Sequence, residues 1–387
     1  MTFMTDERRM IQQTAREFAL EEILPVANKL DPVQGEIPMS LRDKIAEMGF
    51  FGILFPTEYG GMGLGSTEHS LVTEEFSRAW MSVGSIIAQG NAMAVSMGLS
   101  EAQKRRYFPK MVKGEMIGCG SLSEPNVGSD VAAVSCRARR DGDSWVITGN
   151  KYWCTFADGS DFIILLARTS DPVDLKKRHQ GMTTFFIEKP RGQLPQGCTG
   201  NPIPKIGYFG WKTWELSFDG CRVPHENVIG EVGKGFYYML HGLERARAHT
   251  AARAIGVARG GLDDAIAYVH QRVQFSQPIA EFQAIRFKIA KMAAEVEAAR
   301  QLLYSVCEKI DANERCDLES SMAKYVASEM AERVTSEALQ IHGGAGYTKL
   351  HAVERYWRDA RLTKIFEGTS EIQLRIISDH LLGKPKS

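Results

Sequence analysis

Hydrophobic residues recur at helical spacing through the last 150 residues of the chain. In the clearest stripe the apolar positions alternate in steps of three and four, at Phe282, Ile285, Ile289, Met292, Val296, Ala299 and Leu303. Such a stripe stays on one face of an α-helix, and its 22 residues span about 33 Å at the standard helical rise. The pattern predicts a long helix in a bundle core or at a subunit interface, and the spacing alone fits both.

The first hundred-odd residues also show helical periodicity. One segment offers Ser40 as a side-chain cap, Leu41, Ile45 and Met48 as the apolar face, and Gly49 as the end of the helix. The pattern predicts several short helices in this part of the chain.

Between Gly120 and Gly235 the pattern changes to short β-rich runs separated by Gly, Asp and Pro. The runs cover residues 145–148, 162–166, 183–187 and 216–218. The apolar run from Phe162 to Ala167 is far shorter than the roughly 20 residues of a membrane-spanning helix, so it predicts a buried strand. We therefore expect an N-terminal helical domain at 1–119, a middle β domain at 120–235 and a C-terminal helical domain at 236–387.

Composition excludes several classes of protein. The 387 residues are 44% hydrophobic and 24% charged, which is enough for two or three compact regions. The 47 basic and 47 acidic residues balance, so the long-range field of a nucleic-acid-binding protein is not expected. The seven cysteines form no Cys-x-x-Cys pair, and acidic residues near the start argue against a signal or transit peptide. A reduced compartment, the cytoplasm, is expected, with no membrane association.

Familiar catalytic signatures are missing from the sequence. It contains no Gly-x-x-x-x-Gly-Lys-Ser/Thr or Gly-x-Gly-x-x-Gly loop, no His-Glu-x-x-His and no Gly-x-Ser-x-Gly, and its nine histidines are scattered. Neither a metal site nor a serine hydrolase is expected.

Four segments remain as candidates for chemistry, at 122–130, 150–155, 340–347 and 365–373. Each also has an ordinary interpretation: a turn, a strand with a core Trp, glycines at a helix end, and a helix-capping Glu. In the fourth, Glu367 stands between Phe366 and a Gly-Thr-Ser helix start. Burial there would disfavour the ionised carboxylate and raise its pKa towards the range useful for a general base.

Taken together and in this order, the four segments resemble the acyl-CoA dehydrogenase family of flavoproteins. The likeness spans essentially the whole chain and includes the segments 55–61 (Phe-Pro-Thr-Glu-Tyr-Gly-Gly), 218–224 (Phe-Asp-Gly-Cys-Arg-Val-Pro) and 272–275 (Arg-Val-Gln-Phe). The resemblance implies a mostly helical α+β fold with an N-terminal helical domain, a middle β-barrel-like or β-sandwich domain and a C-terminal four-helix bundle.

The resemblance also implies FAD, placed between the β domain and the C-terminal helices. Thr155 would donate a hydrogen bond to flavin N5, close to Trp153. The other contacts within the same subunit would be Leu122, Ser123, Ser129, Thr369 and Glu371. The contacts to the ADP half of a neighbouring subunit's FAD would be Arg272, Phe275, Gln283, Gln340, Gly343 and Gly344. A homotetramer, a dimer of dimers, is therefore expected.

By the same resemblance, Glu367 matches the base that removes the α-proton of an acyl-CoA thioester while the β-hydride leaves for flavin N5. Some relatives carry this base on another helix, but the equivalent position here is Ala246. The residues that match substrate contacts are Ser129, Glu244, Arg247 and Gly368. A surface ion pair is the alternative for Glu244 and Arg247.

The expected reaction is α,β-dehydrogenation of a short- to medium-chain acyl-CoA, branched or substituted chains included, with electrons passed to an electron-transferring flavoprotein. The alternatives are an acyl-CoA oxidase, a β-eliminating (desulfinase-like) member of the same fold and, more remotely, a nucleic-acid-associated stress flavoprotein. Adaptable Met93, Val95 and Met97 are candidates for the acyl pocket. The segment 210–215 (Gly-Trp-Lys-Thr-Trp-Glu) departs from the family pattern. It either reshapes the substrate site or is a repacked surface loop.

Overall fold

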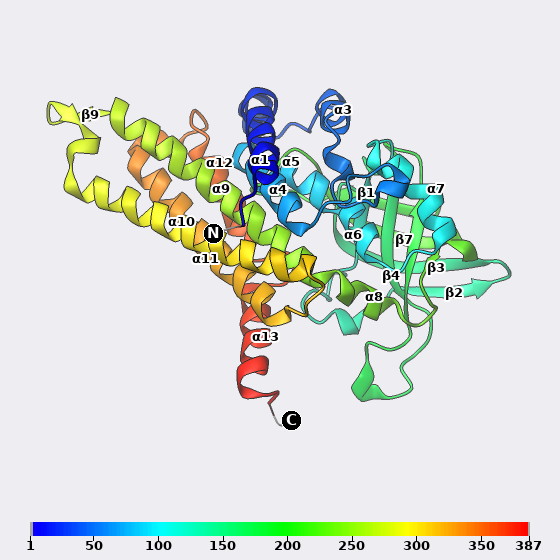
Figure 1. The fold of residues 1–387 in the computed structure, drawn as a ribbon. Coiled ribbons are helices and arrows are strands. Elements are labelled where there is room, and N and C mark those ends of the chain that lie inside the picture. The colour runs from blue at the N-terminus through cyan, green and yellow to red at the C-terminus, as the bar shows by residue number, and fades with distance from the viewer. Residues whose placement is uncertain (1–2, 386–387) are drawn as a thin grey trace.

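The computed structural model describes residues 3–385, and the chain runs from a helical part through a β-sheet to a second helical part (Figure 1). In Figure 1 the sheet and the short helices around it lie on the right, and the long C-terminal helices extend to the left. The order of helices, strands and helices predicted from the sequence is confirmed.

The N-terminal helices are short, and two of them, α4 and α5, pack against the first long helix of the C-terminal part. They are α1 (Asp6–Phe18), α2 (Leu24–Leu30), α3 (Met39–Glu47), α4 (Ser66–Ala79), α5 (Met81–Ala88), α6 (Gly90–Ser96) and α7 (Glu101–Val112). Helix α3 begins one residue before the predicted cap, so Ser40 lies inside the helix and does not cap it. Gly49 follows the helix with φ of 76°, a conformation that glycine adopts at little cost.

The strands of the middle part form one mixed, eight-stranded sheet. The strands are β1 (Gly118–Ser121), β2 (Arg137–Asp141), β3 (Ser144–Thr155), β4 (Phe162–Arg168), β5 (Met182–Glu188), β6 (Cys198–Pro202), β7 (Thr213–Pro224) and β8 (Val228–Ile229). Their order is β6-β7-β3-β2-β4-β5-β8, and β1 pairs with β4 in parallel. All four predicted β runs lie in strands, and the run from Phe162 to Ala167 is completely buried, as expected.

Up to residue 385, six α-helices form the C-terminal part. They are α8 (Gly235–His241), α9 (Leu243–Gln271), α10 (Gln283–Asp311), α11 (Asp317–His342), α12 (Val353–Thr363) and α13 (Ser370–Leu382). A small hairpin of β9 (Val273–Gln274) and β10 (Gln277–Pro278) joins α9 to α10. The predicted stripe lies on α10, except that Phe282 immediately precedes the helix. Its last four members, from Met292 to Leu303, are buried.

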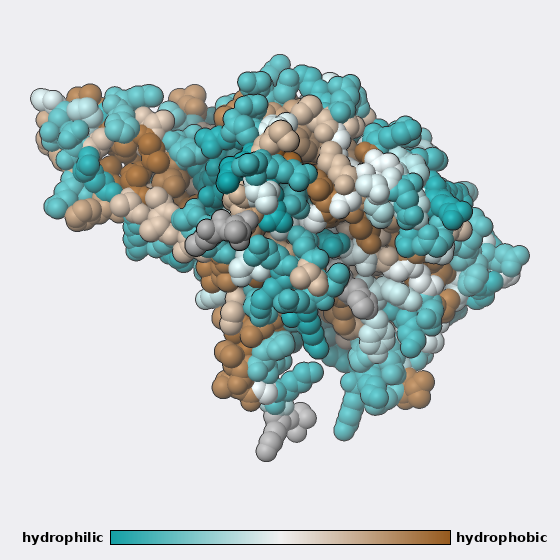
Figure 2. Space-filling view, in the orientation of Figure 1, coloured by the Kyte–Doolittle hydropathy of each residue, from teal (hydrophilic) through white to brown (hydrophobic). Residues whose placement is uncertain are grey.

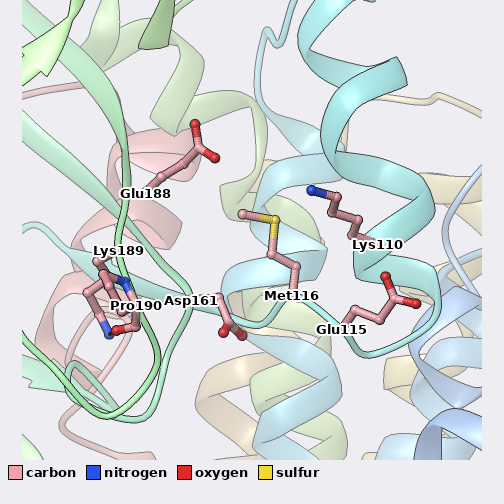
Figure 3. A pocket seen from close by; sticks show the side chains of 7 residues that line it. All are labelled: Lys110, Glu115, Met116, Asp161, Glu188, Lys189 and Pro190. Carbon is pink, nitrogen blue, oxygen red and sulfur yellow. Dashed lines mark hydrogen bonds between the residues drawn. The ribbon is translucent and has the colours of Figure 1, made fainter.

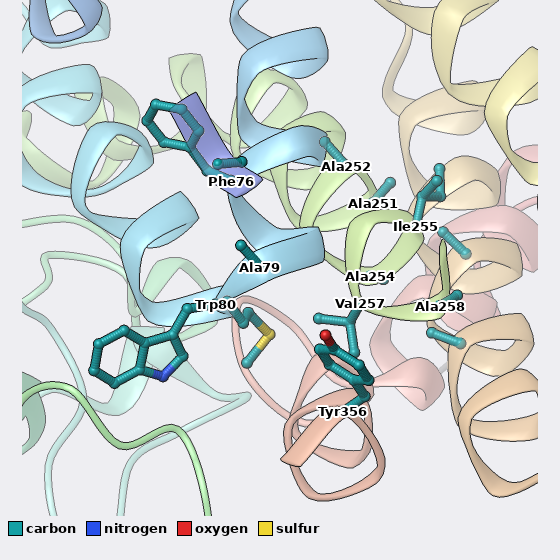
Figure 4. Close-up of a cluster of buried hydrophobic side chains, with 14 of the residues drawn as sticks. Phe76, Ala79, Trp80, Ala251, Ala252, Ala254, Ile255, Val257, Ala258 and Tyr356 are labelled. Carbon is teal, nitrogen blue, oxygen red and sulfur yellow. The ribbon is translucent and has the colours of Figure 1, made fainter. Parts of the chain in front are cut away.

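The contact between α4 and α9 is unusually close because small residues line it (Figure 4). Figure 4 shows a run of alanines on α9, including Ala251 and Ala252, beside Phe76 of α4. A Cβ added at Gly256 would lie 2.3 Å from the carbonyl oxygen of Glu74 on α4. Since nothing larger than glycine fits there, the position of α9 is fixed by backbone contact.

A buried ion pair fixes the loop that follows β1 against β3. The Lys151 Nζ lies 3.0 Å from Glu124 Oε1 and also donates to the carbonyl oxygen of Leu122. Glu124 accepts further hydrogen bonds from Ser135 and from the backbone of Cys136. Both charges are almost fully withdrawn from solvent, so each depends on the other.

No helix in the described part of the chain is long and apolar enough to cross a membrane. All seven cysteines are free and buried.

We predict that Lys151→Met lowers the free energy of unfolding by about 3–5 kcal/mol, because Glu124 is left as an unpaired buried charge. Adding Glu124→Gln should restore part of that loss. Urea unfolding followed by circular dichroism measures both. The control is Lys212→Met, which removes a half-exposed partner of Glu36 and should cost about 1 kcal/mol or less. Equal losses for the two lysine variants would contradict the role given to the buried pair.

Candidate active site

Glu367 lies in the turn between α12 and α13, in a backbone conformation that is rare for a residue with a side chain. Its φ is +54°, and the next residue, Gly368, has φ of +92°. Such strain is common at functional sites. The cap of α13 is Thr369, whose hydroxyl accepts from the backbone N–H of Ile372 at 3.3 Å. The helix-capping interpretation of Glu367 is therefore wrong.

Two neighbouring side chains of α9 hold the Glu367 carboxylate. Arg253 Nη2 donates to Oε1 at 2.5 Å, and Thr250 Oγ1 donates to Oε2 at 2.6 Å. The Nδ1 of His249, on the same face of α9, lies 3.8 Å from Oε2. The Glu367 side chain remains 24% exposed, while Arg253 is fully buried. The carboxylate thus lies at the edge of the protein interior and is held there from the inner side.

This environment reverses the direction expected for the Glu367 pKa. Burial raises the pKa, but the Arg253 guanidinium and the hydrogen bonds from Arg253 and Thr250 outweigh it and lower the pKa to about 2. The prediction of a raised pKa is therefore wrong for this structure. Burial also lowers the pKa of His249 to about 3, so that imidazole is neutral at physiological pH.

Lys324 of α11 fixes the peptide that follows the carboxylate. Its fully buried Nζ donates to the carbonyl oxygen of Gly368 at 2.6 Å, and Gln373 Nε2 donates to the same oxygen at 3.0 Å. Burial lowers the pKa of Lys324 to about 8. Within residues 3–385 the backbone N–H of Glu367 donates to no protein group. A donor next to the carboxylate is thus available for a bound molecule.

An aromatic wall joins this turn to the sheet. The Phe366 ring lies edge-on to Tyr208 at 6.0 Å, and Tyr208 contacts Trp211 at 5.4 Å. Trp211 is buried and also packs against Phe156. The segment 210–215 is therefore not a repacked surface loop, because its first tryptophan reaches, through Tyr208, the residue that precedes Glu367.

On the sheet, Trp153 and Thr155 lie at a break in the strand register. The pairing of β3 with β7 shifts between Lys151 and Cys154, and Trp153 takes φ of +63°. Its indole is 57% exposed, so the interpretation as a core residue is wrong. The hydroxyl of Thr155 lies 3.2 Å from that of Thr213. A large exposed indole beside a partly buried hydroxyl fits a planar aromatic ring, and the flavin of FAD is such a ring.

The loop residues expected near the cofactor differ in exposure. Leu122 and Ser123 are partly buried, and the carbonyl oxygen of Ser123 accepts from the backbone N–H of Tyr152 at 2.8 Å. Ser129 is exposed. On α13, Thr369 is partly buried and Glu371 is exposed.

The second set of expected cofactor residues lies far from the sheet. The hairpin of β9 and β10 forms the end of the bundle opposite the sheet (Figure 1), with Arg272 just before it and Phe275 at its turn. Phe275 is 89% exposed. Tyr268 near the end of α9 stacks on His342 at the end of α11, with ring centroids 4.1 Å apart. The same end of the bundle therefore carries the remaining members of the set, which are all exposed: Gln283, Gln340, Gly343 and Gly344.

Glu244 and Arg247 hold the beginning of α11 and do not form a surface pair. Arg247 is buried and lies 3.7 Å from Asp317 and 3.4 Å from the hydroxyl of Ser320. Glu244 accepts from the backbone N–H of Cys316 at 3.1 Å. The surface alternative is therefore wrong.

Of the acyl-pocket candidates, Met97 is buried and Met93 and Val95 are partly buried, in a cluster between α6 and the sheet. Their contact with an acyl chain stays a prediction.

A separate surface hollow of about 470 Å³ lies beside α7 (Figure 3). It is lined by Lys110, Glu115, Met116, Asp161, Glu188, Lys189 and Pro190. None of these residues is among the predicted site residues, and the hollow does not include Glu367.

Sequence reasoning missed Arg253, Thr250 and Lys324. A signal for Arg253 was present, since it is a single charge among Ala251, Ala252 and Ala254, on the stretch of α9 that packs against α4. A charge at such a position is rarely buried without a partner. The partner itself, more than a hundred residues away, could not be read from the pattern.

Comparison with known proteins adds independent evidence. Three family models match: the N-terminal domain of acyl-CoA dehydrogenase over residues 5–115, the middle domain over 119–221 and the C-terminal domain over 233–382.

Curated relatives and a solved structure agree. A 3-(aryl)acrylate reductase of Clostridium sporogenes is 39% identical over 98% of this chain and 100% of its own length. A (2S)-methylsuccinyl-CoA dehydrogenase of Cereibacter sphaeroides is 40% identical over 98% of this chain and 70% of its own. The solved butyryl-CoA dehydrogenase of Megasphaera elsdenii superposes with a TM-score of 0.91 at 33% identity, covering 98% of this chain and 99% of that one. The chain therefore belongs to the acyl-CoA dehydrogenase family, a family of FAD-dependent oxidoreductases.

Proposed function

We propose that this enzyme carries out FAD-dependent α,β-dehydrogenation of a short- to medium-chain acyl-CoA, with Glu367 as the base that removes the α-proton. The observation that carries the proposal is the Glu367 carboxylate, which is ionised, three-quarters buried and held on a strained turn. The names of the relatives support a short acyl group, including one that carries a second carboxylate.

The residues around Glu367 have distinct tasks in this reaction. An α-proton is weakly acidic, so negative charge developing on the thioester oxygen needs hydrogen-bond donors, and the backbone N–H of Glu367 is one such donor. The wall of Phe366, Tyr208 and Trp211 keeps water from one side of the carboxylate. FAD, when bound, supplies the acceptor for the β-hydride.

FAD itself is proposed to lie between two subunits of a homotetramer. Trp153 and Thr155 would hold its flavin end, and Arg272 of another subunit would pair with its pyrophosphate. The two sets lie at opposite ends of one chain, which supports a site completed by a second chain. Hydrophobic side chains gather on α13 and on the arm formed by the far ends of the long helices (Figure 2). Exposed large hydrophobic residues of these helices include Leu381 of α13 and Phe287 of α10.

An electron-transferring flavoprotein is the proposed acceptor of the electrons. The proposed location is the cytoplasm, and the seven free, buried cysteines support a reducing compartment.

We predict that Glu367→Gln keeps the yellow flavin but slows its bleaching by butyryl-CoA under anaerobic conditions by at least about 100-fold, the usual contribution of a general base. Stopped-flow absorbance measures the rate. The control is Glu47→Gln, at an exposed carboxylate at the end of α3. Bleaching of the Glu367 variant at the rate of the unmodified enzyme would refute the assignment.

We predict that Arg272→Ala weakens FAD binding by about 10-fold or more, because a charge-assisted hydrogen bond to the pyrophosphate is lost. Flavin content after dialysis and a FAD titration of the stripped protein measure the effect. The control is Arg139→Ala, which removes an exposed arginine of β2. If both variants retain FAD equally, Arg272 does not contact the cofactor.

The low pKa of Glu367 predicts the acid side of the pH profile. A carboxylate whose pKa is depressed to about 2 stays ionised as the pH falls, and is lost as a base only on approach to that value. We therefore expect kcat/KM for butyryl-CoA to stay flat between pH 7 and pH 5, while flavin content is checked at each pH. A decline with a pKa of 6 to 7 that shifts in Glu367→Asp would contradict the arrangement in the free enzyme.

A further inference from the structure

Arg253 is a fully buried cation in the middle of α9, and the proposed reaction does not itself require it. Within the described residues its one carboxylate partner is Glu367. Its other hydrogen bonds go to neutral groups: Ser85 Oγ at 3.0 Å, Thr250 Oγ1 at 3.1 Å, and the Nδ1 and carbonyl oxygen of His249 at 3.3 Å and 3.4 Å. Because a buried guanidinium is costly without an anion, its stability depends on that one carboxylate.

Further charged and titratable groups surround this pair. Lys324, from α11, adds a second buried cation, an ammonium next to the turn of Glu367. His249 on α9 and His69 on α4 are kept neutral by burial, which lowers the pKa of His69 to about 4. Tyr208, from the segment before β7, is also neutral because burial raises its pKa. Glu329 and Glu371 also act on Lys324, and Arg245 adds a positive charge near His69 and His249. Arg253 itself is paired with Glu367 alone within the described residues, so a second anion has its place on that guanidinium.

The pairing also conflicts with the task of the base. While Arg253 holds Glu367, the carboxylate is a weak proton acceptor, whereas removal of an α-proton calls for a stronger one. Turning Glu367 towards a substrate would leave Arg253 unpaired, at a penalty that an uncharged acyl chain cannot offset. A carboxylate on the substrate would offset it. It would take the place on Arg253 that Glu367 vacates, since Arg253 is fully buried and Glu367, 24% exposed, lies between it and solvent.

We propose that Arg253 binds a carboxylate carried by the acyl group, so that the preferred substrate is a short dicarboxylic acyl-CoA whose free carboxylate replaces Glu367 on the guanidinium. This inference rests on the proposed function and names its substrate class. The exchange favours release of Glu367 as a base when a substrate of the right charge is bound, and an uncharged acyl group must release it without that compensation. The acyl group is short because Arg253 Nη2 lies only 2.5 Å from the oxygen of the base.

Binding to the holoenzyme tests the proposal, with the flavin reduced beforehand so that the thioesters bind without reacting. Calorimetry compares two matched pairs, succinyl-CoA with butyryl-CoA and glutaryl-CoA with valeryl-CoA, which have equal carbon numbers and differ in the terminal carboxylate. We expect the dicarboxylic member of at least one pair to bind about 10-fold to 100-fold more tightly, the range for a hydrogen-bonded charge. In Arg253→Gln this preference should disappear or reverse.

Two conservative variants keep the test decisive if Arg253→Gln does not fold. Arg253→Lys keeps the charge but loses the fork of donors, so it should reduce the preference several-fold. Arg259→Lys is the control on the same helix, because Arg259 pairs with Glu74 and Glu75 of α4. It should leave the preference unchanged.

The outcomes separate this inference from the proposed function. Equal or weaker binding of both dicarboxylic thioesters, or a preference that survives in both Arg253 variants, overturns the inference. So does tighter binding of 3-phenylpropionyl-CoA than of either dicarboxylic thioester, which would assign Arg253 to stacking on a ring. If the uncharged thioesters bleach the oxidised flavin but show no disadvantage in binding, the dehydrogenase function stands and the inference falls. If the preference is present and no thioester bleaches the flavin, the inference stands and the dehydrogenase function falls.

Discussion

The contact between Arg253 and Glu367 is the interaction on which the rest of the site depends. It brings a carboxylate from the turn after α12 to a guanidinium on α9, two elements more than a hundred residues apart in sequence. The close backbone contact of α9 with α4 fixes one partner, and Lys324 fixes the turn that carries the other. The interior therefore determines both where the Glu367 carboxylate lies and how strongly it holds a proton.

The helices and strands of the fold could be predicted from the sequence because each depends on the spacing of hydrophobic residues within its own segment. The stripe from Ile285 to Leu303 faces the bundle core as its spacing indicates, and the run from Phe162 to Ala167 is the buried strand that its length indicates. The beginning of α3 was harder to predict, since Pro38 occupies the N-cap position and Ser40 already lies inside the helix. Glu367 could be proposed as a site residue because its motif is local and distinctive.

The residues that surround Glu367 could not be predicted from the sequence in the same way. Burial was expected to raise its pKa, and burial does act in that direction, but a guanidinium contributed by α9 reverses the outcome. Trp153 differed for a related reason: a register shift in β3 turns its indole outward, and no alternation of residue types reveals such a shift. In both cases the missing information is a contact between distant segments.

Helix α9 has a further consequence that concerns the whole assembly. The 19 residues from Arg253 to Gln271 span about 28 Å along one continuous helix, and Arg272 follows directly. In the proposed assembly Arg253 contacts the acyl group in its own subunit, and Arg272 contacts the nucleotide half of a neighbour's cofactor. Any shift of α9 when a substrate binds would also move its contact with the neighbour's cofactor. The reaction centres of adjacent subunits would therefore be coupled.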